Sequence, residues 1–390
     1  MEETAHFRDE VLRLCYIIIV QALFPVQPTP DNGSVPIYNE SGVVVVSIAD
    51  DPLGLSANAA VHELASRHLD KAAAAAARLG DVADTEALHD FRVALRRLRA
   101  TEQAYRIPLE VAFSGKLRKR LRRLARATGP ARDTEVQLAW IEEQRLAMRA
   151  HQVPGWHFMR GRLLARLAEE YAHVRGDTVH KFIAFAARLH ESLDLMPPDA
   201  LPVMFAQAGT NALRPLLAEM SARVAALDAE ADDQAVHELR LLAKRVRYLL
   251  DPFAGAIPAA EELAAELADW QDRLGRIHDL QVLGDELITA AQSAGAAAFS
   301  HLIEHALQGT DEQSLQAATR RRDERAGLIA LARRAAAQRH RGLDEIWKKI
   351  RRGEADRLLE GFAEVVAALA VIAPTEGESA ASWPAQYPGD

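Results

Sequence analysis

An internal repeat is the feature that most constrains how this chain can fold. Residues 89–100 read HDFRVALRRLRA, and residues 237–248 read HELRLLAKRVRY. The histidine and each cation recur 148 positions later, as the numbers of His89 and His237 show. The corresponding residues are His89, Arg92, Arg96, Arg97 and Arg99 in the first copy, and His237, Arg240, Lys244, Arg245 and Arg247 in the second.

A second pair of matching stretches follows in the same order. GPARDTEV at residues 129–136 is matched by GRIHDLQV at residues 275–282, an offset of 146. Gly, Asp and Val agree in register, and Arg132 stands opposite His278. Because two ordered matches share almost the same offset, we infer an internal duplication, and we expect two similar structural repeats.

The repeats are predicted to be helical. From about residue 57 to residue 370 the apolar residues follow helical spacing almost without interruption, and the chain is rich in Ala, Leu and Arg with only 6% aromatic residues. The main break, MPPDALP at 196–202, divides this region into two parts of similar length. We therefore predict an all-α domain over 57–370, with repeat one at about 57–195 and repeat two at about 201–370.

Both ends of the chain have a different composition. Residues 1–56 are predicted to be a poorly structured N-terminal segment with one short strand at 43–48, and residues 371–390 a disordered tail. The apolar run at 14–24 is about half the length that spans a bilayer, and its acidic flank does not fit a signal peptide. A single cysteine, Cys15, agrees with a reducing compartment. We therefore expect a cytoplasmic protein without membrane attachment.

The repeated cations form one face of each predicted helix. At about 100° per residue, His89, Arg92, Arg96 and Arg99 share a wedge of roughly 80°, opposite an apolar stripe. Thirteen Lys or Arg residues and only two acidic residues, Glu102 and Glu110, lie between Arg92 and Arg132, although the whole chain has a net charge of -8. This local excess indicates a polyanionic ligand, since the guanidinium fork suits phosphate. An ordinary solvated helix face is the competing interpretation.

These residues resemble the CHAD family, whose conserved histidine opens an Arg-rich helix of the form H-x-x-R-V-x-x-R-R-x-R. His89, Arg92, Val93, Arg96, Arg97 and Arg99 fit that form at each defined position. The family's L-G-x-x-R-D-x-D-V element is similar to residues 128–136, where Thr128 replaces Leu and Glu135 replaces Asp. In the second repeat, residues 237–248 are followed by Leu274, Gly275, Arg276, His278 and Asp279. The resemblance covers about residues 57–370.

The resemblance implies a fold and a function. It implies two antiparallel four-helix bundles related by a pseudo-twofold axis, with inorganic polyphosphate bound by basic residues that face the space between the bundles. Many family members are joined to a CYTH triphosphatase domain, but its E-x-E-x-K motif is not found, because Glu376 and Glu378 are not followed by the lysine. We expect a stand-alone, non-enzymatic module without a cofactor or metal, and a role in targeting to polyphosphate granules would follow from such binding.

The candidate polyphosphate-binding residues combine the cations of both repeats with their histidines. The histidines are expected to donate hydrogen bonds to phosphate and to gain charge as pH falls through about 6.5, with a purely structural role as the alternative. The candidates are His89, Arg92, Arg96, Arg97, Arg99, Lys116, Arg120, Arg123, Arg132, His237, Arg240, Lys244, Arg245, Arg247, Tyr248, Arg276 and His278.

Three other functions compete with this interpretation. Nucleic acid presents a similar backbone, but Tyr248 is the one aromatic residue near these cations that the helical spacing places on their face. The stretch HLIEH, with His301, Glu304 and His305, has the spacing of an inverted zinc-protease motif, although no third ligand is placed by spacing. A helical protein-interaction scaffold is the third alternative. The sequence does not set the oligomeric state.

Overall fold

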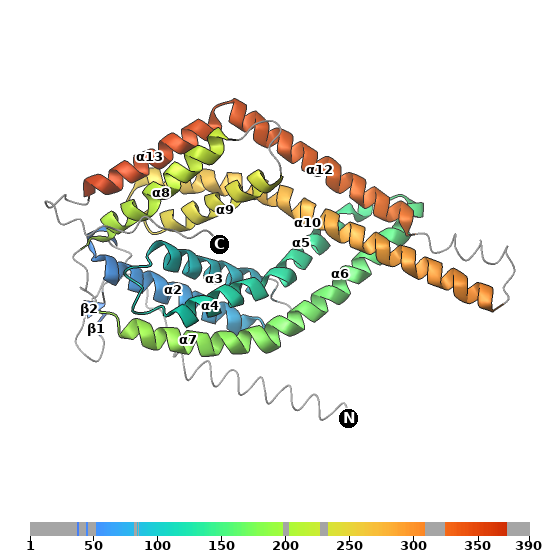
Figure 1. Ribbon diagram of the computed structural model, residues 1–390, viewed down its shortest axis with the longest axis horizontal. Helices are drawn as coiled ribbons and strands as arrows, with labels where there is room; N and C mark the ends of the chain where they lie inside the picture. Colours follow the sequence, from blue (N-terminus) through green and yellow to red (C-terminus); the bar gives the residue numbers. More distant parts are fainter. Residues whose placement is uncertain are drawn as a thin grey trace, which may run out of the picture. The chain divides into compact units, whose positions relative to one another are not determined.

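The computed structural model describes residues 37–38, 44–45, 52–81, 84, 86–197, 203–226, 233–308 and 324–372. These residues are almost entirely helical, so the predicted all-α fold is confirmed (Figure 1). Strand β1 (Ile37–Tyr38) pairs antiparallel with β2 (Val44–Val45), which lies inside the stretch predicted to be a strand. The other predictions for the two ends of the chain fall mostly outside the described residues.

Packing divides the chain into two units, and this division differs from that of the two sequence repeats. Unit 1 comprises the described residues up to Arg126 together with Asp177–Ala208. Unit 2 comprises Ala127–Gly176 and the described residues from Gly209 onward. Residues 127–176 therefore belong to the first repeat by sequence but pack within unit 2. The pseudo-twofold pair of four-helix bundles stays a prediction.

Unit 1 is built around a core of aliphatic and aromatic side chains. Its long helices are α2 (Ala57–Arg78), α3 (Ala87–Ala104), α4 (Gly115–Ala127) and α7 (Val179–Asp194). Helix α2 begins at Ser56, whose hydroxyl accepts a hydrogen bond from the Ala59 N–H at 3.2 Å. The rings of Phe91 in α3 and Phe182 in α7 meet edge to face, 5.0 Å apart, and both are fully buried. This packing fixes which face of α3 turns toward solvent.

Unit 2 contains longer helices. They are α5 (Gly129–Gln144), α6 (Val153–His173), α8 (Phe205–Ala225, whose first residues lie in unit 1), α9 (Asp233–Leu250), α10 (Pro258–Leu307), α12 (Arg325–Arg351) and α13 (Glu354–Ile372). Helix α10 packs against α9, α12 and α13, while α5 and α6 pack against each other. Gly353 has a φ of 72°, a conformation that glycine adopts readily, and it makes the tight turn from α12 to α13.

Two glycines set the crossing of α6 and α12 in unit 2. A Cβ added at Gly155 would lie 2.7 Å from the Gly327 Cα and 2.2 Å from the Glu324 carbonyl oxygen. The backbones of α6 and α12 are therefore in direct contact, and any residue larger than glycine at this position would clash. Around this crossing, Trp156 is buried and its indole N–H donates to the Ile141 carbonyl at 2.8 Å.

Two local features of the helices were not predicted. Helices α6 and α7 are joined through a π-helical stretch, Val174–Thr178, rather than a loop, and the division between the units falls within it. The two matched stretches also differ in setting. Residues 129–136 form the start of α5, whereas residues 275–282 lie inside the uninterrupted α10.

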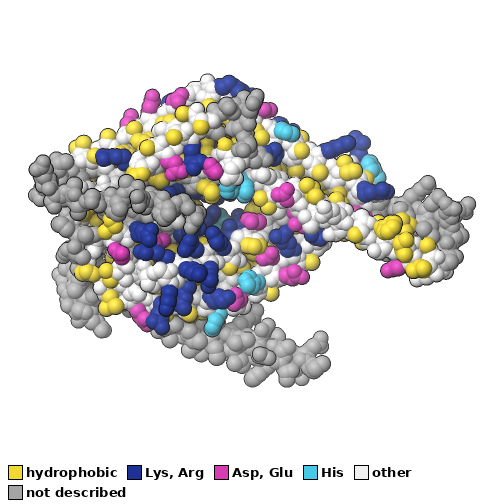
Figure 2. Space-filling model, viewed as in Figure 1, with side chains coloured by type: hydrophobic (Ala, Val, Ile, Leu, Met, Phe, Trp, Pro, Cys, Tyr) yellow, Lys and Arg dark blue, Asp and Glu magenta, His cyan; other side chains and the backbone are white. Residues whose placement is uncertain are grey.

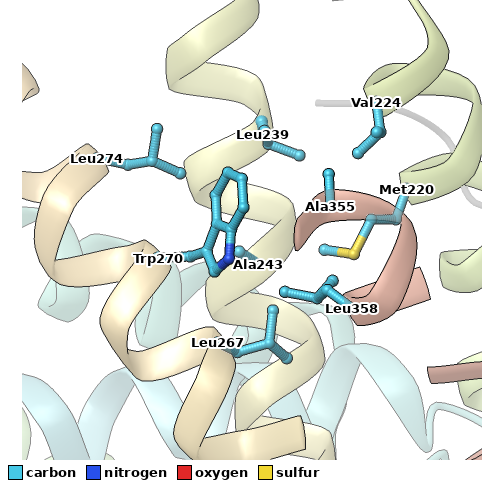
Figure 3. Close-up of a pocket in the computed structure, with 9 residues that line it drawn as sticks. All are labelled: Met220, Val224, Leu239, Ala243, Leu267, Trp270, Leu274, Ala355 and Leu358. Carbon is cyan, nitrogen blue, oxygen red and sulfur yellow. The ribbon is translucent and has the colours of Figure 1, made fainter. Parts of the chain in front are cut away.

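A small apolar cavity lies between α8, α9, α10 and α13 in unit 2 (Figure 3). Its volume is about 20 Å³, and the side chains of Trp270, Met220 and Leu358 point toward one another around it. A space of this size holds about one water molecule and offers it no polar partner. The cavity is therefore a gap in the packing and not a ligand site.

Candidate functional site

The first cationic surface lies on α3 and α4 of unit 1. Helix α4 buries Leu117, Leu121 and Leu124, and its remaining long side chains are all Lys or Arg, which turn outward except for Arg118. Figure 2 shows Lys and Arg side chains gathered where Figure 1 places these two helices. The surface consists of Arg92, Arg96, Arg97 and Arg99 of α3 and Lys116, Lys119, Arg120, Arg122, Arg123 and Arg126 of α4.

An ion pair joins α4 to α3 beneath this surface. The Arg118 guanidinium lies 2.7 Å from the Glu102 carboxylate, and the two side chains are only 19% and 10% exposed. The carboxylate of Glu102 therefore neutralises Arg118 and not a cation of the exposed surface. Burial and repulsion from Arg126 and Arg122 lower the pKa of the Arg99 guanidinium, which shows that the cations of the two helices interact.

Most of the first cationic surface has no acidic counterpart. Among the described residues, no carboxylate lies within ion-pair distance of Arg96, Arg99 or the exposed cations of α4 that belong to the surface. The Nε atoms of Arg96 and Arg99 are hidden from solvent and lack a hydrogen-bond acceptor in the described part of the chain. Donors in this state favour the binding of an anion.

The second cationic surface lies on α9 of unit 2, next to two histidines. It consists of Arg240, Lys244, Arg245 and Arg247, all half-buried, with His237 near the start of α9. The ring of His237 lies 4.7 Å from that of His278 in α10, measured between centroids. A Cβ at Gly275 would lie 3.9 Å from the Arg240 Nε, so the face of α10 that carries Gly275 is turned toward α9.

The pKa values of both histidines of the second surface are lowered, which favours their neutral form. Burial, Arg240, His237 and Lys244 lower the pKa of His278 to about 4, and burial with Arg240 and Lys244 lowers that of His237. The prediction that His89 and His237 gain charge as pH falls through about 6.5 does not extend to His278, whose pKa lies well below that value. Burial is the largest cause of the shift, and the neighbouring cations Arg240 and Lys244, whose closeness to His278 the sequence does not reveal, add to it.

Acidic side chains from the second pair of matching stretches lie close to the second cationic surface. Burial raises the pKa of Asp279, nearby Arg240 and Lys244 oppose that rise, and Asp133 of α5 adds to it. Asp133 and Asp279 occupy matching positions in these two stretches and are thus near each other in unit 2. Arg132 lies 2.9 Å from Glu135, which also accepts a hydrogen bond from the Tyr171 hydroxyl.

Two predicted site residues lie away from the second cationic surface. Tyr248 is 8% exposed, so the prediction that it lies on the open cationic face is wrong; its ring packs beneath Arg247, whose Cζ is 5.5 Å from the ring centroid. Arg276 lines a pocket together with residues of α12, whereas His278 faces α9. The two residues differ by about 200° around the helix, so they point in nearly opposite directions.

The structure gathers most of the other predicted residues on the two surfaces. His89 is half-buried near the start of α3, as His237 is near the start of α9. The first cationic surface also includes Lys119, Arg122 and Arg126, which were not among the predicted residues. Their positions on α4 could have predicted this exposure. The buried leucines of α4 form a narrow apolar stripe, and residues on both sides of such a stripe reach solvent.

The alternative metal motif lies on α10. The rings of His301 and His305 lie with their centroids 4.3 Å apart and their planes inclined by 52°. No group of three or more His, Cys, Asp or Glu side chains in the described ranges is placed to hold a metal ion. Within those same ranges, no helix combines the length and apolar character needed to cross a membrane.

Comparison with known proteins identifies related sequences and folds. The sequence profile of the CHAD domain matches residues 63–288. The CHAD domain from the plant Ricinus communis is 22% identical, with a TM-score of 0.52 over 74% of this chain and 97% of that one. PptA from Streptomyces chartreusis is 15% identical, with a TM-score of 0.52 over 80% of this chain and 99% of that one. A search of curated proteins finds no match.

Proposed function

Because this chain belongs to the CHAD domain family, we propose that it binds inorganic polyphosphate through the first and second cationic surfaces. In this proposal the chain is a binding module and not an enzyme. The histidines beside the cations serve as hydrogen-bond donors to phosphate, and Arg and Lys supply the positive charge.

The observation that carries the proposal is that, among the described residues, no carboxylate pairs with Arg96, Arg99 or the exposed cations of α4. Like charges at helical spacing destabilise a helix, and here the described residues provide a carboxylate for Arg118 but not for the exposed cations around it. A ligand with closely spaced negative charges removes this repulsion along the whole of α4. The buried donors of Arg96 and Arg99 then gain the acceptors that they lack within the described residues.

The aromatic residues favour polyphosphate over single-stranded nucleic acid. Sequence-tolerant nucleic-acid binders commonly stack bases on exposed aromatic rings. Phe91, Tyr105 and Tyr248, the aromatic residues beside the cations of α3 and α9, are all buried. A ligand that has phosphates and no bases therefore suits these surfaces better.

Charge reversal on α4 tests the proposal. Arg120 and Arg123 are exposed and lie outside the apolar stripe, so Arg120→Glu with Arg123→Glu should leave circular dichroism and thermal melting unchanged. The dissociation constant for labelled long-chain polyphosphate should rise by roughly tenfold or more, because two charge-assisted contacts are replaced by repulsion. The matched control is Arg333→Glu with Arg357→Glu, the same charge change at exposed positions of α12 and α13. Equal affinity of the two double variants would contradict the proposal.

The cellular part of the proposal is that the protein resides in the cytoplasm and associates with polyphosphate granules. A fluorescent fusion of the full chain should overlap with stained granules, and the Arg120→Glu, Arg123→Glu variant should not. Overlap that persists in this variant would mean that another feature directs the protein to granules.

A further inference from the structure

A pocket between α10 and α12 in unit 2 lies apart from the second cationic surface. Its volume is about 330 Å³, within the range of small-molecule sites. It is lined by Arg273, Arg276, Ile277 and Leu280 of α10 and by Gln338, Arg341, Gly342 and Glu345 of α12. The α12 wall lies outside the residues that match the family profile, which ends at residue 288.

Only some of the charged side chains in this pocket form ion pairs. Arg273 is held by Asp269 at 2.9 Å and by Glu345 at 3.1 Å, so its charge and that of Glu345 are compensated within the fold. Arg276 and Arg341 are exposed, and no carboxylate of the described residues lies within ion-pair distance of either. Two guanidiniums without a carboxylate partner among the described residues therefore line one concave site, which favours an anionic ligand.

The side-chain amide of Gln338 is a third donor in the pocket, and its orientation is fixed by the fold. The Trp140 indole N–H donates to the Oε1 of Gln338 at 2.7 Å, which fixes the direction of the amide. Since Oε1 is occupied as an acceptor, the Nε2 group of Gln338 keeps its two donor hydrogens, for which the described residues supply no acceptor. Arg276, Arg341 and Gln338 thus offer donors to this pocket, while the one carboxylate in its lining, Glu345, is paired with Arg273.

The opposite wall of the pocket is apolar. Ile277 is 3% exposed and Leu280 lies beside it on α10. Gly342 brings α12 close to this wall, because a Cβ there would lie only 3.0 Å from the Ile277 Cγ1. Ile277 is thus covered by α12, whereas Leu280 is half-buried and keeps apolar surface that a bare phosphate ion would leave without a partner.

We propose that this pocket binds a small phosphate monoester. Arg276 and Arg341 hold the phosphate group, the Gln338 amide donates to it, and the organic part of the ligand packs on Leu280. This site is separate from the cationic surfaces of α3, α4 and α9, so it does not depend on polyphosphate binding.

Titration calorimetry with the full chain tests this site, with adenosine monophosphate and orthophosphate as probes. The variant is Arg341→Glu, an exposed position on α12, and the matched control is Arg333→Glu on the same helix outside the pocket. The parent and the control should bind the monophosphate with the same affinity, and more tightly than orthophosphate. Arg341→Glu should weaken binding at least about tenfold, the expected loss of one charge-assisted contact.

Three outcomes would overturn the proposal. They are no measurable binding of the monophosphate to the parent, equal weakening in Arg333→Glu and Arg341→Glu, and binding of orthophosphate as tight as that of the monophosphate. The Arg120→Glu, Arg123→Glu variant separates this site from the proposed function. Its monophosphate binding should equal that of the parent, whatever its affinity for polyphosphate.

Discussion

The imidazole rings of His237 and His278 lie 4.7 Å apart between α9 and α10, and Arg240 and Lys244 repel a proton on either of them. The two residues are 41 positions apart, and each comes from a different motif of the second repeat. Their closeness makes the second cationic surface sensitive to protons, because a positive charge added on either ring meets Arg240 and Lys244.

Acid should therefore destabilise the fold partly through His278. Its pKa is about 4 in the folded protein against 6.5 for the ordinary residue, so between these values the unfolded chain binds a proton that the folded chain does not. The free energy of unfolding must fall as pH falls through this window. His278→Gln should show a smaller fall in melting temperature from pH 7 to pH 4 than the parent. His180→Gln, at an exposed position of α7, should follow the parent. Parallel curves for all three proteins would contradict the assignment.

Polyphosphate binding should be linked to the same protons. A bound polyanion offsets the field of Arg240 and Lys244 and so raises the pKa of His278. Affinity should then increase as pH falls from 7 toward 5, and the increase should be smaller in His278→Gln. Calorimetry in two buffers of different ionisation enthalpy measures the proton uptake directly. Equal proton uptake by the parent and the variant would show that His278 does not take part.

The crossing of α6 and α12 should tolerate no side chain at Gly155. Gly155→Ala places a Cβ against the backbone of α12 and should lower the free energy of unfolding by about 1–3 kcal/mol or more. Gly161→Ala is the control on the same helix, since its Cβ would meet nothing within 4 Å. That change should be neutral or stabilise by up to about 1 kcal/mol. Urea denaturation of both variants checks the difference, and similar values would rule out the close crossing.

The buried pair of Glu102 and Arg118 should contribute more to stability than an exposed one. Glu102→Gln leaves Arg118 charged in a partly buried position and should cost about 3 kcal/mol. The comparison is Glu142→Gln, which breaks the exposed pair with Arg160 and should cost less than about 1 kcal/mol. Chemical denaturation provides both values. An equal, small loss in the two variants would mean that the first pair does not tie α4 to α3.

Much of the fold could be predicted from the sequence because helical periodicity is a local signal. The leucines of α4 and the apolar stripe of α3 define the buried faces before any tertiary contact is known. The division into units could not be predicted in this way. It depends on α5 and α6 packing with α10 and α12, for which close contacts such as Gly155 with Gly327 are decisive.

The candidate site shows the same limit. Spacing placed the cations of α3 and α4 outward, since one helix alone determines that direction. The burial of Tyr248 and the turn of Arg276 toward α12 depend on neighbouring helices that the sequence does not identify. The neutral state of His278 likewise depends on Arg240 and Lys244 from another helix.

We propose that the first and second cationic surfaces bind a phosphate polymer without bases in preference to nucleic acid. The most direct test is a competition in which labelled polyphosphate bound to the full chain is displaced by unlabelled polyphosphate, single-stranded DNA or RNA at matched phosphate concentration. We expect displacement by polyphosphate at much lower concentration than by either nucleic acid, with an affinity that falls steeply as salt is raised. Equal or better displacement by DNA or RNA would contradict it.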